Sequence, residues 1–165
     1  MPARILVIDD TPEILELFQD LLTDEGYEVL LSARVMQHVT EVERLRPDLI
    51  ILDLLFGTEA AGGHLLHALR GHAATAAIPL IVCTAATGHL HAYEADLRLP
   101  GVFVVAKPFD VDDVLLTIST ALHTGGTLLA LPDAETKPVL GADLAMALPA
   151  TGVVVSTASS APQRC

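Results

Sequence analysis

Short aliphatic runs recur along the chain, separated by segments of helical length. The runs are apolar at successive positions rather than at alternate ones, which predicts strands that are covered on both faces. They lie at residues 5–8, 29–31, 49–52, 80–82 and 102–105. Because each run is followed by a helical pattern, we predict an α/β domain with a five-stranded parallel sheet that is doubly wound by helices on both faces.

Residues 13–25 carry a clear helical pattern, with apolar residues on one face and acidic residues on the other. Pro12 suits the first helical turn, where a missing N–H costs nothing, and Thr11 is expected to cap it. Gly26 suits the helix stop. Further helices are expected at residues 35–46, 63–70, 89–97 and 111–123, the last of them capped by Asp110.

The alternation of strands and helices stops after Gly125-Gly126. Residues 127–165 contain four prolines and few charges, and Thr, Ser, Ala and Gly dominate the last third. This segment is too short for a normal second domain. We therefore expect a folded domain at residues 1–123 and a low-charge, mostly unstructured tail at residues 124–165.

Polar residues follow four of the five predicted strands. The carboxyl ends of parallel strands share one edge of the sheet, and ligands bind beyond that edge, so these residues are expected to converge. They are Asp9 and Asp10 after the first strand, Asp53 after the third, Thr84 at the end of the fourth, and Lys107 with Pro108 after the fifth.

Three carboxylates brought to one edge repel one another. Two unit charges about 4 Å apart interact by roughly 4 kcal/mol at an effective dielectric constant of about 20. Lys107 supplies one compensating charge, and a hard divalent cation such as Mg²⁺ would supply the rest, because it suits carboxylates, a carbonyl and water. A carboxylate beside Mg²⁺ and an ammonium is suited to meet a phosphoryl group, whose oxygens the cations neutralise.

The strand-end residues resemble a known pattern, that of the receiver domain of bacterial two-component response regulators. The match consists of Asp9-Asp10, Asp53, Thr84-Ala85 and Lys107-Pro108-Phe109. It covers about residues 3–123, with four motifs at the right strand ends and in the right order. The resemblance implies a flavodoxin-like (CheY-like) sheet and a signalling phosphoacceptor rather than an enzyme.

The resemblance also implies roles for the acidic residues and the lysine. Asp53 accepts a phosphoryl group from a sensor histidine kinase or a histidine phosphotransfer protein. Mg²⁺ is held, directly or through water, by the carboxylates of Asp9, Asp10 and Asp53 and by the backbone carbonyl of Leu55. Lys107 pairs with Asp53 and then with the phosphoryl oxygens.

Three further positions are implied in the same way. Thr84 moves its hydroxyl toward the phosphoryl group, and the small Ala85 leaves room for that group. Pro108 follows a cis peptide bond, which the energetics of X–Pro bonds permit. The motion of Thr84 is expected to reshape the neighbouring loops and the face formed by the fourth helix, the fifth strand and the fifth helix.

The aromatic part of the family pattern is missing. Many receivers carry Tyr or Phe three residues before the strand-five lysine, where this chain has Val104. The nearest aromatic residue, Phe103, would point to the opposite face of the sheet, because side chains alternate along a strand. We therefore expect a weaker output, or one that runs through Thr84 and loop motion alone.

The loop after Asp53 also departs from the pattern. Gly57 stands where a proline is common, and the glycine that opens the third helix appears about one residue late, as Gly62-Gly63. These differences predict a more mobile loop. Leu55 cannot readily orient an attacking water, so we expect spontaneous loss of the phosphoryl group to be slow, on a scale of minutes or longer.

Three functions are weighed against one another. The preferred one is a single-domain response regulator, phosphorylated on Asp53, that switches a protein–protein interaction with an unknown downstream target; phosphorylation-dependent homodimerisation is left open. The alternative is a receiver-fold interaction module that works without phosphorylation, motivated by Val104 and Gly57. A flavodoxin-like cofactor binder or a phosphatase is disfavoured, because Asp9-Asp10 would repel a flavin phosphate and Leu55 stands where a phosphatase needs a second acid.

Composition and charge narrow the partners. The 165 residues carry a formal net charge of −12, which repels phosphate backbones, so direct nucleic-acid binding is not expected. Only two cysteines occur, which excludes a disulfide framework, and Cys83 is expected to be a small buried apolar residue. No secretory segment opens the chain and no membrane span is expected, so a cytoplasmic location is the default.

Overall fold

The computed structural model describes residues 1–57, 59–85 and 87–124, and it contains the predicted sheet. Five parallel strands lie in the order β2-β1-β3-β4-β5. This confirms the predicted α/β, doubly wound arrangement, and each strand lies within two residues of its predicted bounds. The strands are β1 (Arg4–Ile8), β2 (Glu28–Ser32), β3 (Leu49–Leu52), β4 (Leu80–Thr84) and β5 (Val102–Ala106).

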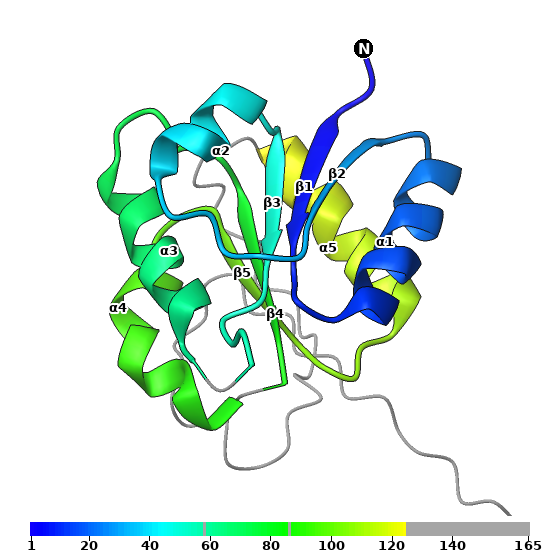
Figure 1. Ribbon diagram of the computed structural model, residues 1–165. Coiled ribbons are helices and arrows are strands. Elements are labelled where there is room, and N and C mark those ends of the chain that lie inside the picture. The colour runs from blue at the N-terminus through cyan, green and yellow to red at the C-terminus, as the bar shows by residue number, and fades with distance from the viewer. Residues whose placement is uncertain (58, 86, 125–165) are drawn as a thin grey trace, which may run out of the picture.

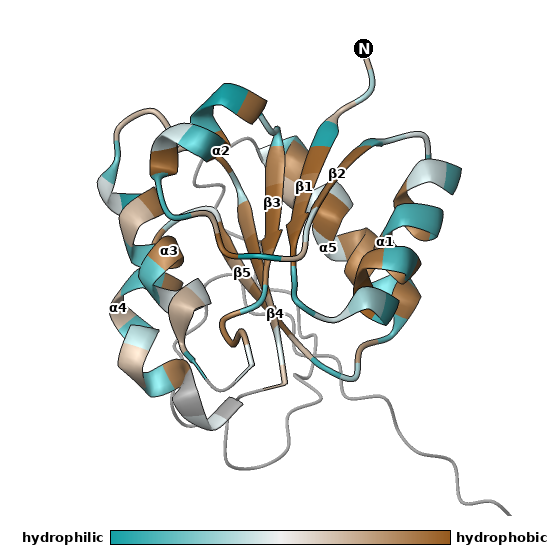
Figure 2. Ribbon diagram, viewed as in Figure 1, coloured by the Kyte–Doolittle hydropathy of each residue, from teal (hydrophilic) through white to brown (hydrophobic). Residues whose placement is uncertain are grey.

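Helices cover both faces of this sheet (Figure 1). One face is covered by α1 (Pro12–Asp24) and α5 (Val111–Thr124), and the other by α2 (Val39–Leu45), α3 (Ala61–Gly71) and α4 (Glu94–Leu97). Within β1, Leu6 and Ile8 belong to the apolar core on the α3 side, whereas Ile5 and Val7 belong to the core on the α1 side. Both faces of the strand are therefore buried, which explains its continuous apolar run and the apolar centre of the domain (Figure 2).

The ends of α1 show how local sequence sets a boundary. Thr11 occupies the N-cap position, but its side chain makes no capping hydrogen bond, so the predicted capping chemistry is wrong. At the other end, Gly26 adopts a φ of +83° as predicted for the helix stop. Its N–H donates to the Thr23 carbonyl (3.0 Å), and the N–H of Tyr27 donates to the Leu22 carbonyl (2.9 Å). These two bonds satisfy carbonyls that the helix leaves open.

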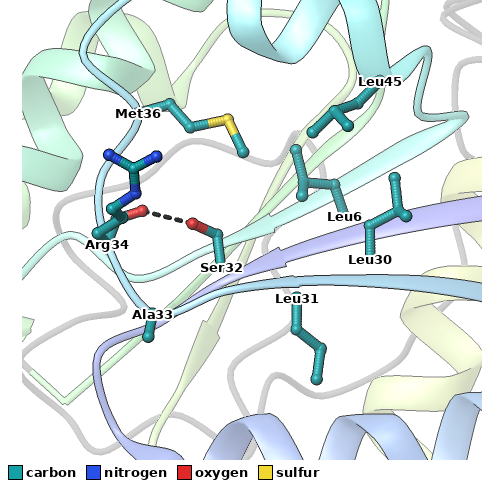
Figure 3. Close-up of a pocket in the computed structure, with 8 residues that line it drawn as sticks. All are labelled: Leu6, Leu30, Leu31, Ser32, Ala33, Arg34, Met36 and Leu45. Atoms are coloured by element: carbon teal, nitrogen blue, oxygen red, sulfur yellow. Dashed lines mark hydrogen bonds between the residues drawn. The ribbon is translucent and has the colours of Figure 1, made fainter.

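The second helix is shorter than predicted, because it begins at Val39 instead of residue 35. The N–H of His38 donates to the carboxylate of Glu41 (3.1 Å), an N-terminal capping arrangement that fixes the start of the helix. The residues before Val39 that were predicted to be helical form a loop instead. At the start of this loop, Ser32 Oγ donates to the Arg34 carbonyl (2.7 Å). A shallow pocket of about 500 Å³ lies beside this loop (Figure 3), lined by Leu6, Leu30, Leu45, Met36 and Arg34 among others.

The predicted helix at residues 89–97 is divided in the structure. A 3₁₀-helix, η1 (Thr87–Tyr93), comes first, and only α4 (Glu94–Leu97) is α-helical. A 3₁₀-helix has about three residues per turn, so residues three apart lie on the same side. Leu90 and Tyr93 fit that period, since Leu90 is buried in the α3-side core and Tyr93 packs against it.

The predicted C-terminal tail falls almost wholly outside the described residues. The predicted tail lies there apart from Thr124, so the division into residues 1–123 and 124–165 stays a prediction. Of the helices in the described ranges, none has the length and apolar character needed to cross a lipid bilayer.

Candidate functional site

The acidic residues predicted at the strand ends do come together. The ladder continues one residue past β3, where the N–H of Asp53 donates to the Ile8 carbonyl of β1 (3.0 Å). Asp53 is thereby held beside Asp9 and Asp10, which follow β1. Carboxylate oxygens of the three residues lie within 4.8 Å of one another. Asp9 and Asp53 are buried, and Asp10 is exposed.

This cluster lies where the strand order reverses. From β1, the chain adds β2 on one side and β3 on the other, and the crevice beyond the carboxyl ends of such strands is the usual ligand site of an open α/β sheet. Asp9, Asp10 and Asp53 leave the two strands that border this point. The topology therefore explains why residues 43 positions or more apart form one acidic site.

Lys107 reaches the same site from β5, across the end of β4. Its backbone N–H donates to the Thr84 carbonyl (2.9 Å), which extends the pairing of β4 with β5. Its ammonium donates to Oδ2 of Asp53 (2.8 Å) and to Oδ2 of Asp9 (2.5 Å). The side chain is only 13% exposed, so solvent screens these two ion pairs weakly.

The charges at the site do not balance. Burial by itself lowers the pKa of Lys107, but its hydrogen bonds to Asp53 and Asp9 and their negative charges outweigh that effect and raise the pKa above its ordinary value. Lys107 is therefore charged at neutral pH. The formal charges of three carboxylates and one ammonium sum to −2, which one divalent cation would neutralise.

Two backbone N–H groups of the β3–α3 loop donate hydrogen bonds to the carboxylates of Asp53 and Asp10. The N–H of Leu55 donates to Oδ1 of Asp53 (3.1 Å), and the N–H of Gly57 donates to Oδ2 of Asp10 (2.7 Å). Gly57 has a φ of +61°, in the left-handed region that favours glycine. A proline there could neither donate this bond nor adopt this φ. Gly57 was predicted to make the loop more mobile, but its N–H joins the loop to Asp10 by a hydrogen bond.

Two glycines allow the start of α3 to pack closely on the backbone of Asp53 and on the ring of Tyr93. A Cβ added to Gly62 would lie 1.9 Å from the Asp53 carbonyl oxygen, so only glycine fits there without movement. The N–H of Gly62 also donates to the Leu54 carbonyl (3.1 Å). A Cβ added to Gly63 would lie 2.0 Å from Cζ of Tyr93. The Gly62-Gly63 pair therefore permits two close contacts, one with Asp53 and one with Tyr93.

The remaining predicted residues lie along the same edge. Thr84 is completely buried at the end of β4, and Ala85 after it is exposed. The Lys107–Pro108 peptide bond is cis, as the resemblance implied. Cys83 is buried as predicted, and burial raises the pKa of its thiol to about 12. The thiol is therefore protonated at neutral pH.

Comparison with known proteins places the chain in a family. Residues 5–119 match the family model of the response regulator receiver domain. The chain belongs to the receiver domain family of response regulators. Receiver domains are signalling phosphoacceptor domains of two-component systems rather than classical enzymes, they bind Mg²⁺ at an acidic site, and they interact with histidine kinases.

Curated relatives of this receiver domain are longer proteins. The DNA-binding response regulator MtrA of Mycolicibacterium smegmatis is 34% identical over 139 residues, which are 82% of this chain and 59% of MtrA. The probable transcriptional regulatory protein TcrX of Mycobacterium tuberculosis is 28% identical over 125 residues, 76% of this chain and 52% of TcrX. The chain thus spans between half and three fifths of the length of these relatives.

Solved structures share the fold. A CheY-like receiver domain protein from Methanospirillum hungatei JF-1 is 26% identical with a TM-score of 0.62, covering 76% of this chain and 97% of that one. The receiver domain of the sensor histidine kinase PA1611 from Pseudomonas aeruginosa PAO1 is 23% identical with a TM-score of 0.63, covering 74% and 99%. Magnesium is coordinated in the active-site cleft of the PA1611 domain.

The two β5 residues weighed for the aromatic position, Val104 and Phe103, lie as predicted. Val104 faces the α3-side core and Phe103 packs against the α1-side core, so the two point to opposite faces of the sheet. Tyr93 was not among the residues predicted from the sequence, although its ring reaches α3 and its hydroxyl donates to the Ala60 carbonyl (3.3 Å). The spacing of Leu90 and Tyr93 was the available signal, but it indicated a buried helix face and not a partner.

Proposed function

We propose that this chain is a phosphoacceptor domain that takes a phosphoryl group on Asp53 from a histidine kinase or a histidine phosphotransfer protein, and that phosphorylation switches a protein–protein interaction. The observation that carries the proposal is the position of the Lys107 ammonium, which donates hydrogen bonds to both Asp53 and Asp9. One acid is thereby held beside a partly buried cation and a second acid, in a cluster whose formal charges sum to −2.

The donor set at this site fits Mg²⁺. The ligands would be the carboxylates of Asp9, Asp10 and Asp53 with the backbone carbonyl of Leu55, all of them hard oxygen donors. The three carboxylate oxygens already lie within 4.8 Å of one another. When bound, Mg²⁺ would supply positive charge to the phosphoryl oxygens and so favour transfer.

The transfer itself is a substitution at phosphorus. A carboxylate oxygen of Asp53 forms the new O–P bond, and the P–N bond of the phosphohistidine breaks, leaving its electron pair on the imidazole nitrogen. The ammonium of Lys107 neutralises charge on the phosphoryl oxygens because it already lies against Asp53. Thr84 would donate its hydroxyl to the phosphoryl group, and the exposed Ala85 would leave space for it.

The partners and the output are part of the same proposal. MtrA is described as DNA-binding, but that description belongs to MtrA, and the expectation that this chain does not bind nucleic acid directly rests on its net charge of −12. The single-domain organisation, the cytoplasmic location and homodimerisation stay predictions. So does a phosphoryl lifetime of minutes or longer, for which the supporting feature is the apolar side chain of Leu55.

A phosphorylation assay tests the proposal. The protein is incubated with acetyl phosphate and Mg²⁺, and intact mass is measured over time. We expect the wild type and an Asp20→Asn control, altered at an exposed acid of α1, to gain one phosphoryl group. Asp53→Asn and a sample treated with EDTA are expected to gain none. Labelling of Asp53→Asn at the wild-type rate would refute Asp53 as the acceptor.

A phosphorylation-independent interaction module is the second candidate, favoured by Val104 at the position where receivers often carry an aromatic residue. In that case Asp53→Ala would bind the physiological partner as well as the wild type does, with or without phosphodonor. Partner binding that requires both Asp53 and phosphodonor would reject this candidate.

A further inference from the structure

The first turn of α3 lies between the backbone of the proposed phosphoacceptor and an aromatic ring. Gly62 packs so closely on the Asp53 carbonyl that a methyl group would not fit, and its N–H is bonded to the Leu54 carbonyl. Gly63, the next residue, packs equally closely on the ring of Tyr93. Neither contact leaves space, so a shift of the backbone at residues 53–54 must be passed to the start of α3.

Tyr93 is held to this turn by polar and apolar contacts. Its hydroxyl donates to the Ala60 carbonyl (3.3 Å), at the residue before α3. Its ring packs against the α3-side core, which also contains Leu90 and Leu97 from the same segment. Tyr93 thus joins the start of α3 to residues 87–97, the segment formed by η1 and α4.

A second link between α3 and this segment is weaker. His67 Nδ1 lies 3.1 Å from Asp96 Oδ2, but the His67 side chain is 78% exposed. Exposed ion pairs contribute little, because solvent screens them and two side chains must be ordered. The packed contact of Tyr93 is therefore the stronger connection.

We propose that Tyr93 is a positioning residue that couples the state of Asp53 to residues 87–97, through the contacts of Gly62 and Gly63. This inference rests on the proposed function. It gives the domain an aromatic element at a position other than Val104, which lies on the same side of the sheet but carries neither a ring nor a hydroxyl.

The close packing explains how a change at Asp53 would reach residues 87–97. Phosphorylation of Asp53 adds negative charge beside Lys107 and changes the hydrogen bonds of the β3–α3 loop, so the backbone at residues 53–55 is displaced. Packed interiors pass on such shifts instead of absorbing them. The hydroxyl of Tyr93 then changes its distance to the Ala60 carbonyl, and residues 87–97 follow the ring.

The chain allows a direct optical test, because it contains two tyrosines and no tryptophan. In the Tyr27→Phe variant, Tyr93 is the only strong fluorophore. Tyr27 packs against the opposite core, so Tyr93→Phe provides the matched control in which Tyr27 alone emits. Beryllofluoride with Mg²⁺ serves as the phosphoryl mimic, and the emission spectrum is recorded during the titration.

We expect the mimic to change the emission of Tyr27→Phe and to leave that of Tyr93→Phe unchanged. Tyr27→Phe combined with Asp53→Asn is expected to show no change. Hydrogen exchange at residues 87–97, measured with and without the mimic, gives the coupling itself. Tyr93→Leu is expected to lose the change in exchange there, and Tyr93→Phe, which keeps the ring but loses the hydrogen bond to Ala60, is expected to show a smaller change. Acetyl phosphate is expected to add the phosphoryl group to both variants.

The outcomes separate this inference from the function on which it rests. If the phosphoryl group is added but Tyr93 emission stays constant, or if Tyr93→Leu keeps the full exchange response, the coupling role is overturned and the phosphoacceptor function stands. If wild-type protein gains no phosphoryl group from acetyl phosphate, the proposed function and the coupling role are both overturned.

Discussion

The ammonium of Lys107 lies 2.8 Å from Oδ2 of Asp53, although β4 separates the two strands that end at these residues. The side chain of Lys107 therefore crosses the end of a whole strand, with only 13% of its surface exposed. The same ammonium bonds Asp9, so one lysine joins the ends of β1, β3 and β5. This side chain is a structural element of the sheet edge as well as a candidate for phosphoryl binding.

Replacing Lys107 by Met should therefore destabilise the fold. The substitution leaves two buried carboxylates without their cation, and breaking a buried ion pair in this way costs roughly 3 kcal/mol. Mg²⁺ at millimolar concentration should reduce that loss, because it offsets the same charges. Urea denaturation of both proteins, with Mg²⁺ and with EDTA, gives the four unfolding free energies. Equal stability of the two proteins in EDTA would contradict the structural role of Lys107.

Cys83 should make stability depend on pH in the alkaline range. Burial raises the pKa of its thiol from 9.0 to about 12, so between these values the unfolded chain loses a proton that the folded chain keeps. Its contribution to the free energy of unfolding is therefore fully present below pH 9 and is lost as pH rises toward 12, by up to about 1.4 kcal/mol per pH unit.

The measurement for Cys83 compares two proteins that both carry Cys165→Ala, so that Cys83 is the remaining thiol. Urea denaturation at pH 8, 9.5 and 10.5 is expected to give a steeper loss of stability for the protein with Cys83 than for its Cys83→Ala variant. Parallel pH profiles would show that the native thiol ionises as easily as the unfolded one.

Gly57 should tolerate Ala better than Pro. Ala keeps the N–H that Asp10 accepts but must adopt a φ of +61°, a conformation that costs an L-residue about 1–2 kcal/mol. Pro loses the hydrogen bond as well and cannot adopt that φ. In metal-free buffer the expected order of stability is wild type, Gly57→Ala, Gly57→Pro. A Gly57→Pro protein as stable as the wild type would mean that the bond to Asp10 is not made in solution.

Gly62→Ala should destabilise the domain and slow its phosphorylation, because the added methyl group would displace α3 from the backbone of Asp53. Gly71→Ala, in the last turn of the same helix, is the matched control, since a Cβ there meets nothing within 4 Å. That control should be stabilised by about 0.5–1 kcal/mol through helix propensity. Thermal unfolding and acetyl phosphate labelling give both quantities, and an unchanged Gly62→Ala protein would contradict the close packing.

The sequence was informative where the topology itself sets the contacts. Asp9, Asp53 and Lys107 could be assigned to one site because parallel strands end at one edge, whatever the details of the loops. The start of the second helix and the 3₁₀ turn at residues 87–93 were predicted wrongly, because they depend on a local cap at His38 and on the packing of Tyr93. Contacts between helices, such as Tyr93 with Gly63, are not encoded in the periodicity of either segment.

Locating the phosphoryl group tests the role of Asp53 directly. After reaction with acetyl phosphate and Mg²⁺, borohydride reduction converts an aspartyl phosphate to homoserine, and peptide mass spectrometry identifies the converted residue. We predict homoserine at position 53 in the wild type and in Asp20→Asn, and none in samples prepared with EDTA. Conversion at Asp9 or Asp10 with residue 53 unmodified, or no conversion at any aspartate, would contradict the assignment of Asp53 as the phosphoacceptor.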